Sequence, residues 1–185
     1  MSMVDCHLPV PITTPRLVIR DAIRADMRGW SALYRSPKVR QHMNGPLKRK
    51  PQEWWGRLQQ HSADLDRPLS IALPETNELV GACGFLNGAQ LGERETWLLL
   101  RAKFWGKAIG TEVTSSLVGV AFASLDAQRV IGIVDPANHA SVNMIKKIGF
   151  AFVREYSGKV PWQLGHHIYS IERHTHSRAT QSELT

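Results

Sequence analysis

A short loop of small residues that leads into a helix constrains most strongly how this chain folds. Residues 105–112 read Trp-Gly-Lys-Ala-Ile-Gly-Thr-Glu and lie between an apolar run and a stretch with helical periodicity. The first N–H groups of a helix have no partner within the helix, so such a loop gathers several of them at the positive end of the helix dipole. This place suits a phosphate or pyrophosphate and needs few cationic side chains.

A second segment, at residues 138–150, has the marks of another helix. It starts with Asn138, a residue type that caps helices, and reaches Gly149, a residue type at which helices end. Together the two segments predict a phosphate-bearing cofactor that one helix holds and the next helix contacts.

Length and composition favour an ordinary globular protein. The chain has 185 residues, which predicts one domain with a sizeable core, and 43% of them are hydrophobic. No run approaches the roughly 20 apolar residues of a membrane helix, and the first residues lack the pattern of a signal peptide. With two cysteines there is no disulfide framework, so we expect a cytoplasmic protein without membrane contact.

The positive charge of the chain is concentrated at one end. Residues 1–60 hold 11 Lys and Arg against 4 Asp and Glu, whereas residues 61–185 hold 12 of each. The excess of +7 therefore lies in the first third of the chain. It is either a solvated basic face or a surface that attracts an acidic partner, such as RNA, the ribosome or an anionic substrate.

The hydrophobic pattern predicts an α+β fold. Apolar runs predict strands at residues 17–20, 70–73, 79–85, 95–100, 129–134, 150–156 and 167–171. Helical spacing predicts helices at residues 23–34, from residue 51, at residues 109–124 and from residue 138. Residues 1–14 are expected to form an N-terminal arm, and residues 174–185 a polar, flexible tail.

This order of motifs resembles the GCN5-related N-acetyltransferases over nearly the whole chain. The acetyl-CoA loop of that family reads Arg/Gln-x-x-Gly-x-Gly/Ala, and residues 105–110 fill it with Trp105 first and Ala108 at the usual central glycine. The Asn-x-x-Ser motif from Asn138 fits the family closely, and the phrase Thr-Pro-Arg-Leu-Val-Ile-Arg at residues 14–20 resembles the ribosomal-protein alanine acetyltransferase branch. The resemblance implies one domain at residues 15–173, with a central mixed, mostly antiparallel sheet flanked by helices.

The resemblance also implies acetyl-CoA as cofactor, leaving as coenzyme A. The backbone of Leu100 and Ala102 would pair with the pantetheine arm, and Asn138 would contact it as well as cap its helix. Lys107 either touches a phosphate or is a solvated lysine. The cofactor-binding residues expected in this way are Leu100, Ala102, Trp105, Gly106, Lys107, Ala108, Ile109, Gly110, Thr111, Asn138 and Asn143.

Two residues are candidates for the chemistry of acetyl transfer. Glu95 precedes an apolar run at a place where related enzymes hold a carboxylate, so it is either a general base or a surface strand residue. Many relatives place a tyrosine acid where this chain has Ile145. Ser141 is the substitute candidate for the general acid, and its alternative role is capping of the Asn138 helix.

Several functions remain open from the sequence. The leading prediction is an N-acetyltransferase that moves an acetyl group to a primary amine, on a small molecule or a protein N-terminus, by direct attack. The alternatives are toxin-like acetylation of aminoacyl-tRNA and a binding module that keeps acetyl-CoA affinity without catalysis. We expect a monomer or homodimer and no metal site, and we expect Trp54 or Trp55 to line the acceptor groove.

Overall fold

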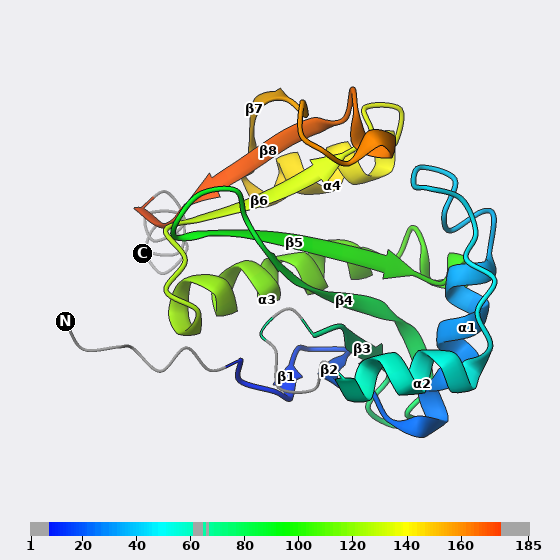
Figure 1. Ribbon diagram of the computed structural model, residues 1–185. Coiled ribbons are helices and arrows are strands. Elements are labelled where there is room, and N and C mark those ends of the chain that lie inside the picture. The colour runs from blue at the N-terminus through cyan, green and yellow to red at the C-terminus, as the bar shows by residue number, and fades with distance from the viewer. Residues whose placement is uncertain (1–7, 61–64, 66, 175–185) are drawn as a thin grey trace.

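The computed structural model describes residues 8–60, 65 and 67–174, which form an eight-stranded sheet with helices around it (Figure 1). The strands lie in the order β1-β2-β3-β4-β5-β6-β8-β7, and each neighbouring pair is antiparallel except β5 and β6, which run parallel. The predicted α+β fold with a mixed, mostly antiparallel sheet is confirmed. The strands are β1 Ile12–Thr13, β2 Val18–Asp21, β3 Leu69–Ala72, β4 Leu79–Asn87, β5 Glu93–Leu100, β6 Arg129–Val134, β7 Ala151–Glu155 and β8 His167–Glu172.

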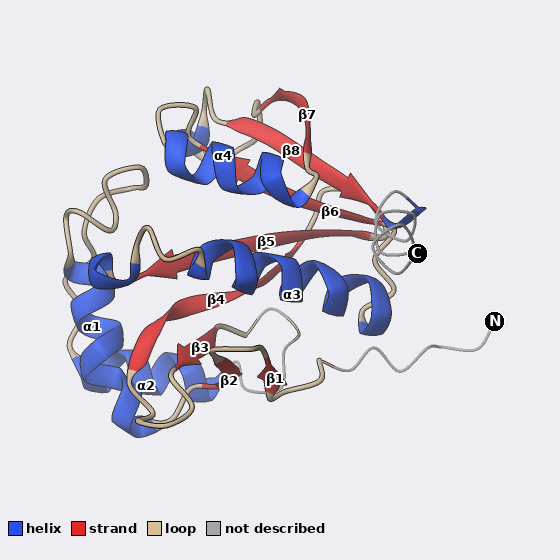
Figure 2. Ribbon diagram, turned by 180° about the vertical axis from the view of Figure 1, so that it is seen from behind, coloured by secondary structure: helices blue, strands red, loops and turns tan. Residues whose placement is uncertain are grey.

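Helices cover both faces of this sheet. In Figure 2 the helices α3 and α4 lie over one face, whereas α1 and α2 lie on the far side of the sheet, near the end of β4. The α-helices are α1 Met27–Arg35, α2 Pro51–Gln60, α3 Ile109–Ser124 and α4 His139–Ile148, and the short 3-10 helices are η1 Arg24–Asp26, η2 Ala102–Phe104 and η3 Pro161–Gln163. No helix in the described residues is long and apolar enough to cross a bilayer.

The side chains of β5 divide between two hydrophobic cores, because successive side chains of a strand point to opposite faces. Leu98 and Leu100 pack on the core that contains α3. Trp97 and Leu99 belong to the core on the other face, where α1 contributes the fully buried Trp30. The strand β5 therefore separates two sides of one molecule, and each side has its own helices.

Residues 8–14 are more closely attached to the domain than the expected arm. Leu8 is buried in the main core with 1% of its surface exposed, and β1 pairs with β2. The folded unit therefore begins before residue 15. Residues 1–7 and 175–185, which the sequence assigns to the arm and the tail, lie outside the described residues.

The strands β5 and β6 pair over a short length and then separate. Their pairing runs from Glu93 opposite Arg129 to Glu95 opposite Ile131. Beyond that point β5 continues to Leu100 and β6 to Val134, and the two strands diverge across Figure 1. An opening is left in the middle of the sheet.

Beyond the pairing at Glu95, β5 has no strand partner on the side of this opening. Gly88 N–H donates to the Glu93 carbonyl and Arg101 N–H donates to the Val80 carbonyl, so the odd-numbered residues of β5 bond to β4. Backbone groups alternate in direction along an antiparallel strand. Those of residues 96, 98 and 100 therefore point into the opening.

Candidate active site

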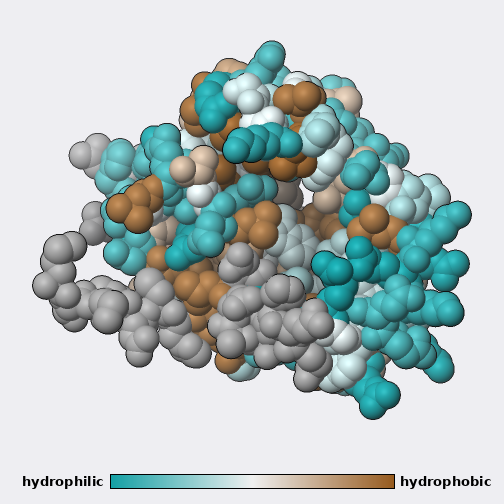
Figure 3. Space-filling model, viewed as in Figure 1, coloured by the Kyte–Doolittle hydropathy of each residue, from teal (hydrophilic) through white to brown (hydrophobic). Residues whose placement is uncertain are grey.

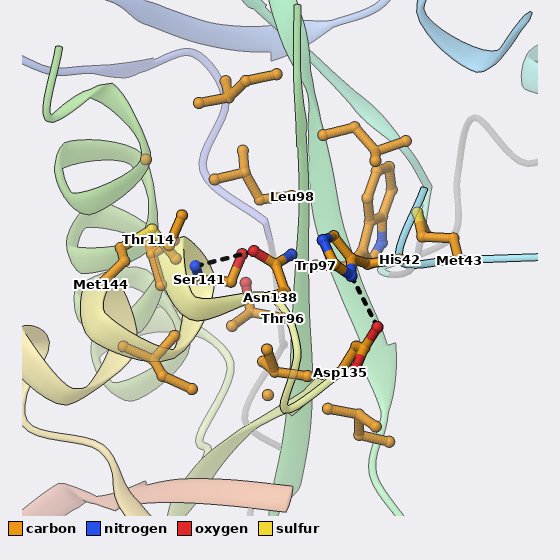
Figure 4. A pocket seen from close by; sticks show the side chains of 18 of the residues that line it. His42, Met43, Thr96, Trp97, Leu98, Thr114, Asp135, Asn138, Ser141 and Met144 are labelled. Atoms are coloured by element: carbon orange, nitrogen blue, oxygen red, sulfur yellow. Dashed lines mark hydrogen bonds and ion pairs between the residues drawn. The ribbon is translucent and has the colours of Figure 1, made fainter. Parts of the chain in front are cut away.

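A cleft of about 810 Å³ occupies this opening and continues to both faces of the sheet. Its walls come from β5, the start of α3, α4, the loop after α1 and the segment around η3. Figure 4 looks into the cleft and labels side chains around it from β5, α3, α4 and the loop after α1. The site is therefore built from segments that lie far apart in the sequence.

The loop before α3 presents unpaired backbone donors to one end of the cleft. Gly106 and Ala108 both have positive φ, at +73° and +57°, and Ala108 is the N-cap residue of α3. No side chain caps this helix, and no group in the described part of the chain accepts from the N–H groups of Ile109, Gly110 and Thr111. Three N–H groups at the positive end of a 16-residue helix form an anion site.

The phrase at residues 14–20 holds this loop in place. Glu112, in the first turn of α3, accepts hydrogen bonds from the Thr14 hydroxyl at 2.6 Å and from Arg16 Nε at 2.7 Å. Arg16 also donates from Nη1 to the Lys107 carbonyl at 2.9 Å. Burial raises the pKa of Glu112, but the hydrogen bonds from Thr14 and Arg16 and the charge of Arg16 outweigh burial and lower it.

Gly110 lets α3 approach its neighbours closely. A Cβ atom at this position would lie 2.7 Å from Met144 Sδ in α4 and 3.5 Å from Leu98 in β5. Any side chain here would push Met144, which lines the cleft. The second glycine of the loop is therefore a packing requirement, while Gly106 is required by its backbone angle.

The unpaired edge of β5 lies beside the anion site. Leu98 and Leu100 both line the cleft, and the Leu100 carbonyl already accepts from Trp105 Nε1 at 2.9 Å. Lys38 Nζ lies 5.5 Å from the centre of the Trp105 indole ring. Leu98 was not predicted from the sequence, because its role follows from the pairing of β5 with β4 and not from a motif.

The start of α4 brings Asn138 and Ser141 to the opposite wall (Figure 4). The Asn138 side chain accepts from the backbone N–H of Ser141 at 3.2 Å and caps the helix. Ser141 takes part in this cap through its backbone alone, and no group in the described residues bonds to its hydroxyl. The Ser141 hydroxyl is therefore available to a ligand in the cleft, whereas Ile145, at the position of the missing tyrosine, is buried.

Glu95 lies in the cleft without a bonding partner among the described residues. Burial, together with the nearby negative charge of Glu93, raises its pKa to about 7. Glu93 is itself occupied, since it accepts from Ala89 N–H at 3.0 Å and lies 3.8 Å from Arg129. Glu95 is thus a carboxyl group that gains and loses a proton near neutral pH.

His42 and Asp135 form a hydrogen-bonded pair that no local sequence pattern predicts. His42 Nδ1 lies 2.7 Å from Asp135 Oδ2, and the pair joins the loop after α1 to the end of β6 (Figure 4). Burial raises the pKa of Asp135, but hydrogen bonds from His42 and Ala137 and the charges of His42 and His166 outweigh burial and lower it. The two residues are 93 positions apart, which explains why sequence reasoning missed them.

Most of the predicted site residues line the cleft. Ala102 and Lys107 are not in its described lining: Ala102 begins η2, and Lys107 places its Nζ 5.8 Å from the Phe104 ring. The predicted residues along the cleft are Glu95, Leu100, Trp105, Gly106, Ala108, Ile109, Gly110, Thr111, Asn138, Ser141 and Asn143.

The tryptophan that we expected to line the acceptor groove, Trp54 or Trp55, does not line the described cleft. Trp54 packs in the α1 core with its ring 4.4 Å from that of Tyr34, and neither Trp54 nor Trp55 is in the described lining of the cleft. Tyr34 lines the cleft instead, together with Trp97 and Trp162. The helix α1 turns Tyr34 toward the cleft, while α2 supports it from behind.

The fold and the cleft define the class of this molecule as an α+β protein that can hold a phosphate-bearing ligand between two separated strands. Residues 16–151 match the family described as the acetyltransferase (GNAT) domain. This match covers most of the chain. The chain therefore belongs to the GNAT acetyltransferase family, whose members use acetyl-CoA.

A curated protein of known sequence is also similar to this chain. The uncharacterized N-acetyltransferase p20 of Bacillus licheniformis is 31% identical over 91 residues, which cover 47% of this chain and 51% of that protein. The chain thus matches about half the length of this curated relative.

Two solved structures resemble the fold. A GNAT-family acetyltransferase from Bacillus anthracis has a TM-score of 0.75 at 18% identity, covering 88% of this chain and 98% of that one. Spermidine N-acetyltransferase from Vibrio cholerae, in complex with CoA and spermine, has a TM-score of 0.72 at 14% identity, with coverage of 88% and 98%. At identities of 18% and 14%, these two structures show a similarity of fold alone.

Proposed function

We propose that this protein transfers the acetyl group of acetyl-CoA to a primary amine. One observation supports this most directly: the free N–H groups of α3 and the unpaired edge of β5 border the same cleft as Glu95. The N–H groups suit the pyrophosphate, and the edge of β5 suits an extended amide chain such as pantetheine. Bound acetyl-CoA supplies a thioester carbon for the amine to attack.

Three residues of the cleft would carry the proton transfer and the stabilisation of the leaving group. Glu95 accepts a proton from the incoming ammonium group, directly or through water, which leaves a neutral nucleophile. The hydroxyl of Ser141 donates a hydrogen bond to the sulfur that departs. Asn138 fixes the start of α4 and so fixes the position of Ser141.

The acceptor side favours an amine with one positive charge and an apolar body. Aromatic rings from Tyr34, Trp97 and Trp162 line the cleft. The described lining holds two carboxyl groups, and that of Asp135 is bonded to His42 Nδ1, so Glu95 is the one whose side chain has no bonding partner among the described residues. A polyamine such as spermidine, with several positive charges, would leave most of them without a partner.

A thiol-release assay with acetyl-CoA tests this proposal. We expect arylalkylamines, or peptides with an apolar first residue, to exceed spermidine in kcat/KM by about tenfold or more, the equivalent of about 1.4 kcal/mol. The two kinds of acceptor form separate arms of the assay. Spermidine as the best acceptor contradicts the substrate class, whereas CoA binding by calorimetry without thiol release from any amine favours a binding module instead.

The excess of positive charge in residues 1–60 favours a second candidate function, in which an anionic carrier presents the amine. Hydrophilic side chains gather over α1, α2 and the loop between them, at the right of Figure 3. Exposed cations on these segments are Arg28, Arg35, Lys38, Lys48, Lys50 and Arg57. Acetylation of aminoacyl-tRNA, with a KM that rises steeply with salt, would support this candidate, and no transfer to aminoacyl-tRNA would exclude it.

A further inference from the structure

The geometry of His42 and Asp135 is that of an oriented base. Asp135 Oδ1 accepts from the backbone N–H of Ala137 at 2.9 Å, and Oδ2 lies 2.7 Å from His42 Nδ1. The turn after β6 therefore fixes the carboxylate, and the carboxylate fixes the imidazole ring. About a quarter of each side chain is exposed, at 26% for His42 and 24% for Asp135, so the pair lies in the wall of the cleft.

The ionised state of Asp135 determines where the ring proton lies. An ionised carboxylate accepts and cannot donate, so Nδ1 of His42 carries the hydrogen of this bond. In the neutral ring Nε2 is then left with a free lone pair. A histidine held through Nδ1 by an aspartate is an arrangement that acts as a general base in other enzymes.

The free nitrogen faces the reaction cleft. In Figure 4 one nitrogen of the His42 imidazole is joined to Asp135, and the other is directed toward the side on which Asn138 and Ser141 lie. That wall and the unpaired edge of β5 enclose the space that the proposed function gives to the thioester. His42 Nε2 thus faces the space in which the proposed function would place the amine and the thioester.

Acetyl transfer to an ammonium ion requires two protons to leave the nitrogen, and Glu95 accounts for one. We propose that His42, oriented by Asp135, accepts the second proton as the nitrogen–carbon bond forms. The carbon–sulfur bond breaks, and the sulfur takes a proton from solvent. His42 and Glu95 then return their protons to solvent, so that one proton is released per acetyl group. The inference rests on the proposed function.

Other titratable groups share the cleft with His42. Those in its described lining are Tyr34, Lys38, Glu95, Asp135, Lys147 and His166. The Nε2 atom of His166 is buried without a partner among the described residues, and its ring lies 5.7 Å from that of Trp162. A pH profile of the wild type alone therefore cannot be assigned to one group, and variants are needed.

The variants His42→Gln and Asp135→Asn test the pair on a substrate that the wild type uses. We expect His42→Gln to lower kcat about 100-fold while the Kd for CoA, measured by calorimetry, stays within about twofold. The acid limb of log kcat/KM against pH should become shallower by one proton. Asp135→Asn should lower kcat by about tenfold or more, because the ring loses its orientation. His139→Gln, an exposed histidine at the start of α4, is the matched control and should be unaffected.

Chemical rescue separates a proton acceptor from a residue that only holds the loop. Added imidazole should restore part of the kcat of His42→Ala, and it should do nothing for Asp135→Ala, which still has its own imidazole. An unchanged kcat in His42→Gln, or a rise in KM alone, overturns the proposal. A wild type that binds CoA but acetylates no amine refutes the proposed function instead, so the two failures are distinguishable.

Discussion

At the scale of single residues, the protonation of Glu95 gives the most direct prediction. With a pKa of about 7, raised by burial and by Glu93, its ionised fraction rises about tenfold between pH 6 and pH 8. We expect Glu95→Gln to lower kcat by about 100-fold and to remove this contribution from the pH profile. The exposed Glu75→Gln is the matched control. An unchanged pH profile would refute the role of Glu95 as proton acceptor.

The same carboxyl group makes a prediction about stability that does not depend on activity. A raised pKa means that the folded state holds its proton more tightly than the unfolded state, whose Glu95 ionises near the ordinary pKa of 4.5. Folding therefore loses stability as pH rises from about 4.5 to about 7. Glu95→Gln should unfold at a higher temperature than wild type at pH 8, and at the same temperature at pH 4.

Ala108 carries a backbone conformation that favours glycine. Its φ of +57° costs an alanine about 1 kcal/mol relative to glycine. We expect Ala108→Gly to raise the free energy of unfolding by up to about 1 kcal/mol and to leave CoA binding intact. Ala123→Gly, at an exposed position within α3, is the contrasting control and should lower stability by about 1 kcal/mol. Destabilisation in both variants would show that Ala108 is not strained.

Single residues could be predicted from the sequence where a local rule applies. Gly106 and Asn138 follow from the geometry of helix starts, and both line the cleft. The pair of His42 and Asp135 could not be predicted, because it exists only after the loop following α1 meets the end of β6. The same is true of Leu98, whose free backbone depends on which residues of β5 bond to β4.

At the scale of elements, the segment before β2 acts as a clamp on α3. Arg16 is about half exposed at 49%, so its bond to Glu112 is worth about 1 kcal/mol rather than the full value of a buried pair. We expect Arg16→Ala to weaken CoA binding by about three- to tenfold, because the loop that carries the N–H donors is released. Arg24→Ala, an exposed arginine in η1, should leave the Kd unchanged in calorimetry.

Acid should remove the effect of the clamp. The pKa of Glu112 is lowered in the folded state, so its stabilisation is complete above the ordinary pKa of 4.5 and is lost as pH falls through the lowered value. The loss of stability in Arg16→Ala should therefore be present at pH 7 and much smaller at pH 3. Equal losses at both pH values would mean that Arg16 acts by packing alone.

The boundaries of the elements could be predicted well, but their arrangement could not. Caps and apolar spacing place α3, α4 and most strands, since these signals are local. The first helix is in fact divided into η1 and α1, and Leu8 extends the domain past the predicted arm. The separation of β5 from β6 creates the cleft and has no local signal. The resemblance to a family implied a mixed sheet and a pantetheine contact at Leu100, but this separation was not among the expectations.

At the scale of the whole molecule, the cleft lies between two parts of the sheet that share a short pairing. One part of the sheet carries β1 to β5 and the other carries β6 to β8, and the two are joined by three paired positions between β5 and β6. Helix α3 packs against both of these strands, and α4 packs against α3 and β6. A ligand between the strands therefore contacts both parts at once, and its binding is coupled to their stability.

We expect coenzyme A to stabilise the whole fold in one cooperative transition. At a free concentration of 100 times its Kd, it should raise the free energy of unfolding by about 2.7 kcal/mol. Pantetheine at the same concentration lacks the pyrophosphate that the N–H groups of α3 would bind, so it should produce a much smaller rise in the unfolding temperature. If pantetheine stabilises the protein as well as coenzyme A does, the anion site at Ile109, Gly110 and Thr111 contributes nothing to binding. If coenzyme A stabilises one part of the sheet and leaves the other to unfold separately, the cleft does not couple the two parts.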